Sequence, residues 1–335
     1  MPRKYTTQTA SLKTTFADIR NLDAKNIKIK GQNIEELWGL NLPEDYKKFV
    51  TRCELPEDEN WSIWDDTGNL LYINFSDKII NGNGMFSRTG LTSFTSDLSS
   101  LTSGESMFLV CDNLTTFNSD LSSLTNGKQM FQDCSNLTAF TSDLISLTNG
   151  FYMFSGCDNL TTFNSDLSSL TDGYCMFEDC SNLTTFNSDL SSLTNGERMF
   201  YGCTNLTAFT SDLSSLTDGS NMFYGCTNLT AFTSDLSSLT DGYSMFLGCT
   251  NLTAFTSDLS SLTDGRYMFS GCKLDSNSIE NILTTIPTIT KASTLPIGIQ
   301  ESAASKFAEI TGLTPTTTEQ TVSYKGWNVK VKINN

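Results

Sequence analysis

Histidine is absent from this 335-residue sequence, and its absence excludes several kinds of active site. Without it there is no Ser-His-Asp triad, no Cys-His pair, no zinc site with a histidine ligand and no imidazole base near pH 7. The candidates for chemistry that remain to be weighed are therefore the carboxylates and the cysteines.

Basic residues are scarce as well, since 21 lysines and arginines stand against 37 aspartates and glutamates, for a net charge of −16. Binding to nucleic acid or to anionic lipid needs clustered positive charge, so we expect neither partner. No apolar run approaches the ~20 residues of a membrane span. No secretory signal or lipid-anchor motif is visible either, and we expect no membrane insertion.

What the sequence does contain is a repeat, marked by a Met-Phe pair that recurs once after 22 residues and then after every 23. Written from Met107, the unit is M-F-x-x-C-x-N-L-T-x-F-x-S-D-L-x-S-L-T-x-G-x-x. Periods of this size are typical of solenoids, in which stacked copies bury a continuous core. The pairs begin at Met85, Met107, Met130, Met153, Met176, Met199, Met222, Met245 and Met268.

The spacing of apolar residues predicts the path of the chain in one copy. Residues 114–117 suit a short strand rung, residues 121–124 a corner, and Asn126-Gly127 a turn with positive φ. Residues 130–134 suit a single helical or 3₁₀ turn. We predict a repeat solenoid of short stacked β rungs, with buried side chains at Leu114, Phe117, Leu121, Leu124, Met130 and Phe131.

Three regions follow from where the repeat begins and ends. We predict an N-terminal α/β attachment or oligomerisation region at 1–68, the solenoid at 69–272 with a degenerate first repeat at 69–84, and a C-terminal α/β cap at 273–335. In the cap, residues 277–280 look like a capping box that opens a helix. Residues 302–310 predict a second helix that Gly312 ends, and alternation at 327–333 predicts a final strand.

Eight cysteines share one offset of the repeat. Metal binding needs clustered thiolates, and a disulfide ladder needs side chains that point toward each other. Because all eight share one inward offset, we favour small, buried apolar side chains. The column is Cys111, Cys134, Cys157, Cys180, Cys203, Cys226, Cys249 and Cys272, with Cys53 and Cys175 outside it.

Two further columns carry polar residues. The aspartates suggest either a calcium ladder or turn residues that accept backbone N–H groups, and we favour the turns. Paired-carboxylate catalysis needs two different environments, which near-identical copies do not provide. This column is Asp97, Asp120, Asp143, Asp166, Asp189, Asp212, Asp235 and Asp258.

Asparagines begin an Asn-Leu-Thr triplet in most copies, which is formally a glycosylation acceptor. A ladder of stacked Asn side chains that bond the backbone between coils explains the repetition better. The column is Asn113, Asn136, Asn159, Asn182, Asn205, Asn228 and Asn251.

Alignment of the copies with one another separates scaffold from surface. Variation is concentrated in the two residues after each Gly and the two after each Met-Phe pair, where rings recur in the middle and later copies. Exposed tyrosines suit contact with a sugar or a protein, and the alternative is ordinary tolerance of a solvated edge. The candidate ligand-binding residues are Phe151, Tyr152, Tyr174, Tyr201, Tyr224, Tyr243 and Tyr267.

The unit at residues 199–209, Met-Phe-Tyr-Gly-Cys-Thr-Asn-Leu-Thr-Ala-Phe, resembles the BspA-type leucine-rich repeat surface proteins and the related repeat of mycoplasma-type lipoproteins. The likeness covers about residues 69–280. It implies a leucine-rich-repeat-like solenoid with adhesive or surface roles.

The ends of the chain are similar to those of repeat proteins from crAss-like phages of gut Bacteroides. Residues 26–34 look similar to attachment segments of virion appendages, and a closing Lys-Gly-Trp strand like residues 325–327 recurs there. A virion protein leaves the cell by lysis, which would reconcile a surface-type repeat with the absence of a visible signal peptide.

These patterns lead to a non-enzymatic protein without cofactors. The leading hypothesis is a virion surface component, such as a head or tail fibre, that binds other virion proteins or further copies of itself through residues 1–68 and a cell-surface glycan or protein through the solenoid. The alternative is an extracellular adhesin on a bacterial cell surface. A β-helical polysaccharide depolymerase would need a unique acidic pair at a break in the repeat, and no break occurs between Met107 and Cys272.

Overall fold

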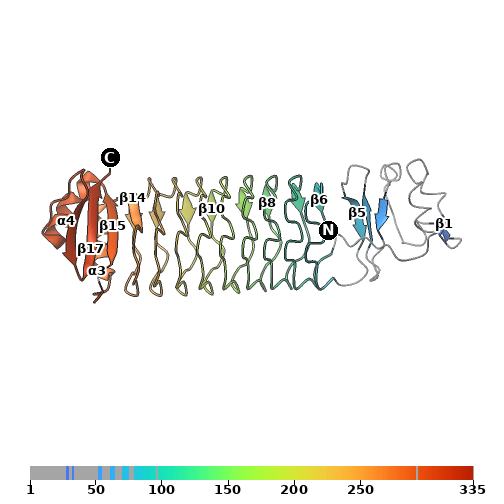
Figure 1. The fold of residues 1–335 in the computed structure, drawn as a ribbon, viewed down its shortest axis with the longest axis horizontal. Coiled ribbons are helices and arrows are strands. Elements are labelled where there is room, and N and C mark those ends of the chain that lie inside the picture. The colour runs from blue at the N-terminus through green and yellow to red at the C-terminus, as the bar shows by residue number, and fades with distance from the viewer. Residues whose placement is uncertain are drawn as a thin grey trace.

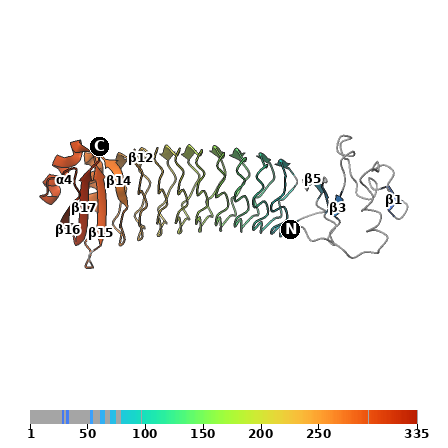
Figure 2. The same cartoon turned by 45° about the horizontal axis from the view of Figure 1, so that its top comes forward.

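The computed structural model describes residues 79–95, 97–291 and 293–334, together with the backbone of five short strands nearer the N-terminus. Coils of nearly constant size stack side by side along the long axis of the molecule (Figure 1). A sheet and two helices close the C-terminal end of this stack, which Figure 2 shows from a second direction. The predicted solenoid is confirmed.

Each coil contributes one two-residue strand, and these strands pair in parallel, two by two. In β10 (Thr185–Phe186) and β11 (Ala208–Phe209), Thr185 lies opposite Ala208 and Phe186 opposite Phe209. Adjacent residues of a strand point to opposite faces, so the Phe is buried while its neighbour faces solvent. The other rungs are β6 (Ser93–Phe94), β7 (Thr116–Phe117), β8 (Ala139–Phe140), β9 (Thr162–Phe163), β12 (Ala231–Phe232) and β13 (Ala254–Phe255).

A second ladder lies at the residue before each turn glycine, which is Asn or Asp except at Ser103. Single parallel bridges connect Asn81 to Ser103 and continue without interruption as far as Asp264. Threonines beside this ladder also bond between coils, as when Thr148 Oγ1 donates to Thr125 O over 3.1 Å. The coils are therefore connected on both sides of the core.

The predicted helical turn is a run of turns with the 3₁₀ spacing. Met130 N–H donates to Gly127 O, and Cys134 N–H donates to Phe131 O. Gln129 and Asp133 have φ values of 54° and 58°, so the turns do not extend into a regular helix. Because of these left-handed residues, alternate N–H groups are directed toward the next coil, and Asp133 N–H donates to Ser155 O there over 2.8 Å.

The core contains two columns of phenylalanine that interlock. Each rung Phe stacks on the rung Phe of the next coil and meets the Phe of the Met-Phe pairs edge to face. Phe186, for example, lies 5.7 Å from Phe163 and 4.7 Å from Phe200 between ring centroids. The six positions predicted to be buried are 0–4% exposed, which confirms the assignment of inside and outside.

Nearer the N-terminus, five strands are described: β1 (Lys28–Ile29), β2 (Gln32–Asn33), β3 (Arg52–Glu54), β4 (Trp61–Trp64) and β5 (Leu70–Asn74). β5 pairs antiparallel with β4, unlike the parallel rungs of the solenoid, although residues 69–84 were expected to form a degenerate first repeat. The rest of the predicted 1–68 attachment region lies outside the described residues, so its division from the solenoid stays a prediction.

The C-terminal region forms a four-stranded sheet in the order β14-β15-β17-β16. Its strands are β14 (Phe269–Leu274), β15 (Thr294–Ile299), β16 (Gln320–Tyr324) and β17 (Trp327–Ile333). The second predicted helix and the final strand are confirmed as α4 (Ala304–Thr311), which follows the 3₁₀ turn η4 (Glu301–Ala303) and ends at Gly312, and as β17.

The first helix of this region, α3 (Ser276–Thr285), begins before the expected capping box. Its N-cap is Asp275, whose side chain accepts the N–H of Ser278 over 2.8 Å, so the placement of the cap at Asn277 was wrong. Asp275 supplies the acceptor that the first turn of a helix lacks. The helix buries Ile279, Ile282 and Leu283.

Helix α3 also ends the rung ladder. Ser278 Oγ accepts the N–H of Phe255 over 2.8 Å, and Asn281 Oδ1 accepts the N–H of Ser257 over 3.1 Å. These side chains take the place of the backbone of a further coil. An unpaired sheet edge invites pairing with another chain, so the helix protects this end from open-ended stacking.

Replacement of Phe186 by Ala should lower the free energy of unfolding by about 3–5 kcal/mol, because it leaves a cavity between stacked rings. Thr185→Ala is the matched control, because its side chain is exposed and Ala already stands at the equivalent position 208. Urea unfolding should place the control within about 0.5 kcal/mol of the wild type. Equal losses in both variants would contradict the packing described here.

At Gly225 the effect of backbone conformation can be measured without a steric clash. Its φ is 74°, and a Cβ attached there would have no atom within 4 Å apart from its chain neighbours. Gly225→Ala should cost about 1–2 kcal/mol, because an L residue is strained there. Gly225→Asn should cost less, as Asn tolerates this region. Thermal melts should rank the wild type above the Asn variant and the Asn variant above the Ala variant, and a different order would contradict this account.

Candidate functional site

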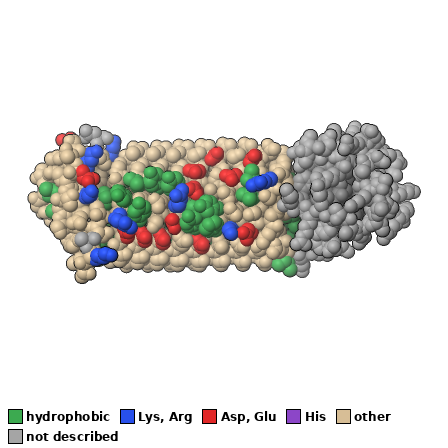
Figure 3. All heavy atoms as spheres, in the orientation of Figure 1, with side chains coloured by type: hydrophobic (Ala, Val, Ile, Leu, Met, Phe, Trp, Pro, Cys, Tyr) green, Lys and Arg blue, Asp and Glu red, His purple; other side chains and the backbone are tan. Residues whose placement is uncertain are grey.

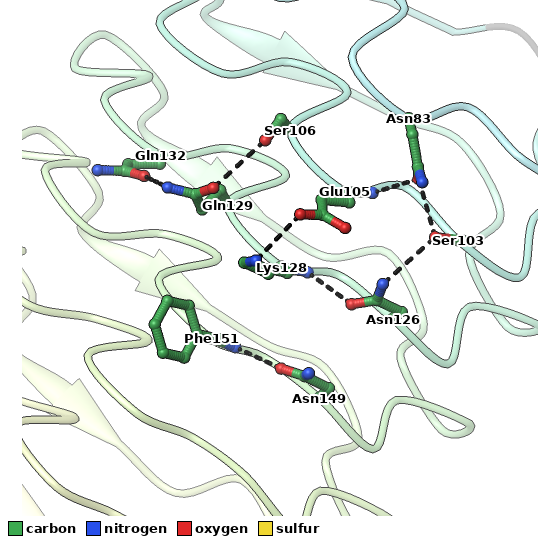
Figure 4. A network of polar contacts seen from close by, with 10 residues as sticks. All are labelled: Asn83, Ser103, Glu105, Ser106, Asn126, Lys128, Gln129, Gln132, Asn149 and Phe151. Atoms are coloured by element: carbon green, nitrogen blue, oxygen red, sulfur yellow. Dashed lines mark hydrogen bonds and ion pairs between the residues drawn. The ribbon is translucent and has the colours of Figure 1, made fainter.

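The variable positions form one face of the solenoid, here called the ring face: the two residues after each turn glycine and the two after each Met-Phe pair, from Lys128 to Ser270. The backbone fixes how these side chains leave the coil. Phe151 N–H is accepted by Asn149 Oδ1 over 3.0 Å (Figure 4), and Tyr243 N–H is accepted by Asp241 Oδ1 over 2.9 Å. Tyr152 and Tyr267 follow with φ values of 54° and 61°. The rings are therefore presented by a rigid frame.

At the N-terminal end of the ring face, three rings from two coils pack together. Phe151 and Tyr174 stack with centroids 4.9 Å apart and planes 11° apart. Tyr152 meets both rings edge to face, at 4.7 and 5.5 Å. Cys175 is buried beside Tyr152, and this burial raises the pKa of its thiol to about 12.

In the middle of the ring face, Tyr201 and Tyr224 stack with centroids 4.7 Å apart. The guanidinium of Arg198 lies 4.2 Å from the centroid of Tyr201 and forms an ion pair with Glu178 of the preceding coil. Both partners of Arg198 are contributed by the ring face, so the cation belongs to it.

The same arrangement recurs at both ends. Arg266 pairs with Asp264 at 2.6 Å and lies 5.2 Å from the centroid of Tyr243, whose ring meets Tyr267 edge to face at 5.8 Å. Lys128 pairs with Glu105 at 3.1 Å and lies 5.7 Å from the centroid of Phe151 (Figure 4). Each cation thus combines one carboxylate with one ring, and such cation–π contacts add to an ion pair.

The structure brings the seven predicted rings onto one face but exposes them less than expected. Only Tyr267, at 52%, is an exposed side chain, and the other six are half-buried because they cover each other. Figure 3 shows green apolar patches over the middle and C-terminal coils, separated by basic side chains and flanked by acidic ones. Whether these residues bind a ligand stays a prediction.

The cations of this face were not predicted from the sequence. Arg198, Lys128 and Arg266 occupy the same variable positions as the rings, and that placement was the available signal. Their role depends on carboxylates of other positions or neighbouring coils, which the spacing alone did not indicate.

Other carboxylates of this face form no salt bridge with any described residue. The pKa of Glu197 is raised by burial and by the charges of Asp218 and Asp241 on the following coils. Burial and neighbouring acids, Asp158 among them, likewise raise the pKa values of Asp133 and Asp179. A raised carboxyl pKa means that the charged form is disfavoured unless positive charge approaches.

A family model for the BspA-type leucine-rich repeat region matches residues 62–184 and 173–297, in six copies, which is more than half of the chain. The chain belongs to the BspA-type leucine-rich repeat family. The resemblance inferred from the Met-Phe unit is therefore confirmed at the level of the family. The resemblance to phage virion proteins is not supported by this match.

Several solved structures are similar to this BspA-type chain. A leucine-rich repeat protein from Bacteroides ovatus is 17% identical, with 77% of this chain and 95% of that chain covered and a TM-score of 0.25. A leucine-rich cell surface protein from Faecalibacterium prausnitzii is 16% identical, with coverage of 85% and 95% and a TM-score of 0.31. An internalin from Listeria monocytogenes is 14% identical, with coverage of 73% and 83% and a TM-score of 0.26.

Similarity at this level supports no inference about a ligand or partner. No curated protein matches the chain significantly.

In this BspA-type repeat the aspartate column forms turns, as favoured. The Oδ1 atom of each accepts the N–H two residues later, at 2.8 Å for Asp189 and Ser191. These backbone contacts lower the pKa values of Asp97 and Asp189. Within the described ranges, no group of three or more metal-ligating residues is close enough to hold a metal ion. No helix there is long and apolar enough to cross a membrane.

The asparagine column forms a ladder, though mostly through side chains. Asn182, Asn205 and Asn228 each donate from Nδ2 to the Oδ1 of the Asn one coil earlier, over 3.3–3.4 Å. Asn136 Nδ2 instead donates to the backbone O of Asp112 over 2.7 Å, the kind of bond that was expected. Both contacts hold neighbouring coils in register.

The cysteine column is buried, as predicted, but it is not purely apolar. Each thiol donates to the carbonyl oxygen of a Phe in the preceding coil, as Cys203 Sγ does to Phe177 O over 3.1 Å. Nine cysteines are free and buried in the described part of the chain. Burial raises the pKa values of these thiols, well above the ordinary value for Cys203 and Cys226.

The free energy of unfolding should therefore fall as the pH rises above about 9. The thiols of the unfolded chain ionise there while those of the folded chain stay protonated, so the folded state binds more protons and loses relative stability. Urea titrations between pH 7 and 10.5 measure the slope. Iodoacetamide labelling at pH 9, followed by peptide mass spectrometry, should modify these nine thiols only after unfolding. Rapid labelling of native Cys203 would contradict their burial.

Proposed function

We propose that this BspA-type protein is a non-enzymatic recognition protein of an outer surface, whose ring face binds a partner. The observation that carries the proposal is that the sequence differences between coils are confined to one face. Interior and turn positions hardly vary between coils, whereas seven rings and three cations gather at the variable positions of one face. Aromatic and arginine side chains are the residues most enriched at binding hot spots.

Rigidity supports the same proposal. The rings are stacked on each other and attached to coils joined by backbone hydrogen bonds, so little side-chain freedom is left to lose on binding. A surface ordered in advance avoids part of the entropic cost of association. An extended partner along successive coils would benefit most, because each coil repeats the geometry of the last.

The family carries surface and adhesive roles, which favours a bacterial cell surface as the location. The virion placement, with attachment through residues 1–68, rests on the resemblance of the chain ends. Mass spectrometry of purified phage particles and of fractionated cells distinguishes the two, because the chain would be found in only one of them. The same proposal assigns no catalytic residue to the chain.

A triple variant, Tyr174, Tyr201 and Tyr224→Ala, tests the ring face. We expect it to lose about tenfold or more in affinity across a panel of glycans, extracellular proteins and whole cells, because it removes three hot-spot side chains. The matched control is Thr116, Thr162 and Thr185→Ala on the exposed rung face, where other coils already carry Ala.

Thermal melts must show that both triple variants remain folded. Equal binding by the ring variant and the wild type would remove the ring face as the site. Binding by neither protein to any member of the panel would favour a purely structural role instead.

A further inference from the structure

Two arginines of the chain show how the ring face binds a positively charged group. Arg198 lies between Glu178 and Tyr201, and Arg266 combines Asp264 with Tyr243. In both cases a guanidinium pairs with a carboxylate and covers a tyrosine ring. The planar guanidinium suits both contacts at once. In these two places the repeat accommodates a cation between a carboxylate and a ring.

A related group of carboxylates lies between these two sites, with Arg198 near Glu197 and Arg266 near Asp241. Glu197 stands one coil after Tyr174 at the equivalent position, and Asp241 lies two residues before Tyr243. Asp218 belongs to the coil between them. Among residues 79–95, 97–291 and 293–334, no salt bridge involves Glu197, Asp218 or Asp241.

The mutual effect of these three carboxylates is repulsive. Burial and the charges of Asp218 and Asp241 raise the pKa of Glu197, and the nearby charge of Arg198 offsets only part of this effect. Asp218 and Asp241 each use Oδ1 to accept a backbone N–H, from Ser220 and Tyr243, which leaves their second oxygen for another donor. A positive group placed here would relieve the repulsion and find acceptors that are already oriented.

The rings limit what else can bind. Phe151 and Tyr174 cover one face of each other, and Tyr201 lies between Arg198 and Tyr224. A sugar stacks through its flat face, and few ring faces in this array are free to receive one. Tyrosine combines an apolar ring edge with a polar hydroxyl group, and both suit the side chains and backbone of a polypeptide.

We infer that the ring face binds a basic polypeptide segment, whose Lys or Arg side chains pair with Glu197, Asp218 and Asp241 and lie against Tyr174, in the way that Arg198 and Arg266 pair with a carboxylate and a ring within the chain. This inference rests on the proposed function and names the class of partner. The net charge of −16 adds long-range attraction for such a segment and repels anionic polymers.

The test uses three synthetic 12-residue peptides that alternate Ser with Lys, Glu or Gln, and measures their binding to the full-length protein by calorimetry at about 0.15 M salt, where distant charges are screened. We expect binding of the Lys peptide alone. The variant Glu197→Gln, Asp218→Asn and Asp241→Asn should weaken it about tenfold. Asn already stands at positions 149 and 195 of the second ladder, so the two Asp→Asn changes keep the turn acceptor.

The matched control is Asp189, Asp212 and Asp235→Asn, which removes the same charge from the exposed aspartate column and also keeps its turn acceptors. It should change the affinity less than about twofold. Equal losses in the two charge variants would show non-specific attraction and overturn the inference. So would failure of the wild type to bind the Lys peptide, or equal binding of the Gln peptide.

A different pattern separates this inference from the proposed function. If Tyr174, Tyr201 and Tyr224→Ala abolishes binding of a neutral glycan while the Glu197, Asp218 and Asp241 variant binds it normally, the ring face is a binding site but its partner is not a basic polypeptide. If both variants bind every ligand of the wild type, both proposals fail.

Discussion

Hydrogen bonding between the backbones of neighbouring coils is the interaction on which the rest of this molecule depends. Rung, second ladder and turn each direct N–H or C=O groups along the long axis, toward the coil before or after. A buried backbone group without a partner is costly, so no coil is stable in isolation. Repetition of one sequence satisfies the requirement, because identical coils place donors opposite acceptors.

This axial bonding explains which positions are free to vary. Side chains that pack against or bond to neighbouring coils must match the coil above and the coil below, and the phenylalanine, cysteine and asparagine columns meet that condition with one residue type each. Positions on the ring face meet solvent on one side and can change at little cost in stability. Recognition can therefore diversify on a scaffold that stays constant.

The axial bonding also creates a problem at the ends. A stack of identical coils would leave an open edge on which further copies could add. At the C-terminus, Ser278 and Asn281 of α3 satisfy the last rung with side chains, and β14 continues the stack into a sheet that is mostly not repetitive. The end is therefore closed by side chains that do not belong to the repeat, and they accept the same backbone N–H groups that a further coil would accept.

The sequence by itself determined the solenoid, its period, the buried positions of each coil, the turn role of the aspartates and the rings that share a face. These follow from local spacing, because a position that holds the same residue type in every coil has the same surroundings in every coil. The N-cap of α3 at Asp275 was missed, since other nearby residues could also cap a helix. The antiparallel pairing of β5 with β4 was missed as well, since the sequence does not show which strand pairs with which.

Only the tertiary structure decided how the side chains of neighbouring coils combine. The thiol bonds to Phe carbonyl groups, the stacking that half-buries the rings, and the pairing of Arg198 with Glu178 all join residues about one coil apart. A sequence pattern shows which residues occupy equivalent positions. The distances between them depend on the axial rise and on backbone φ, which are set when the coils pack.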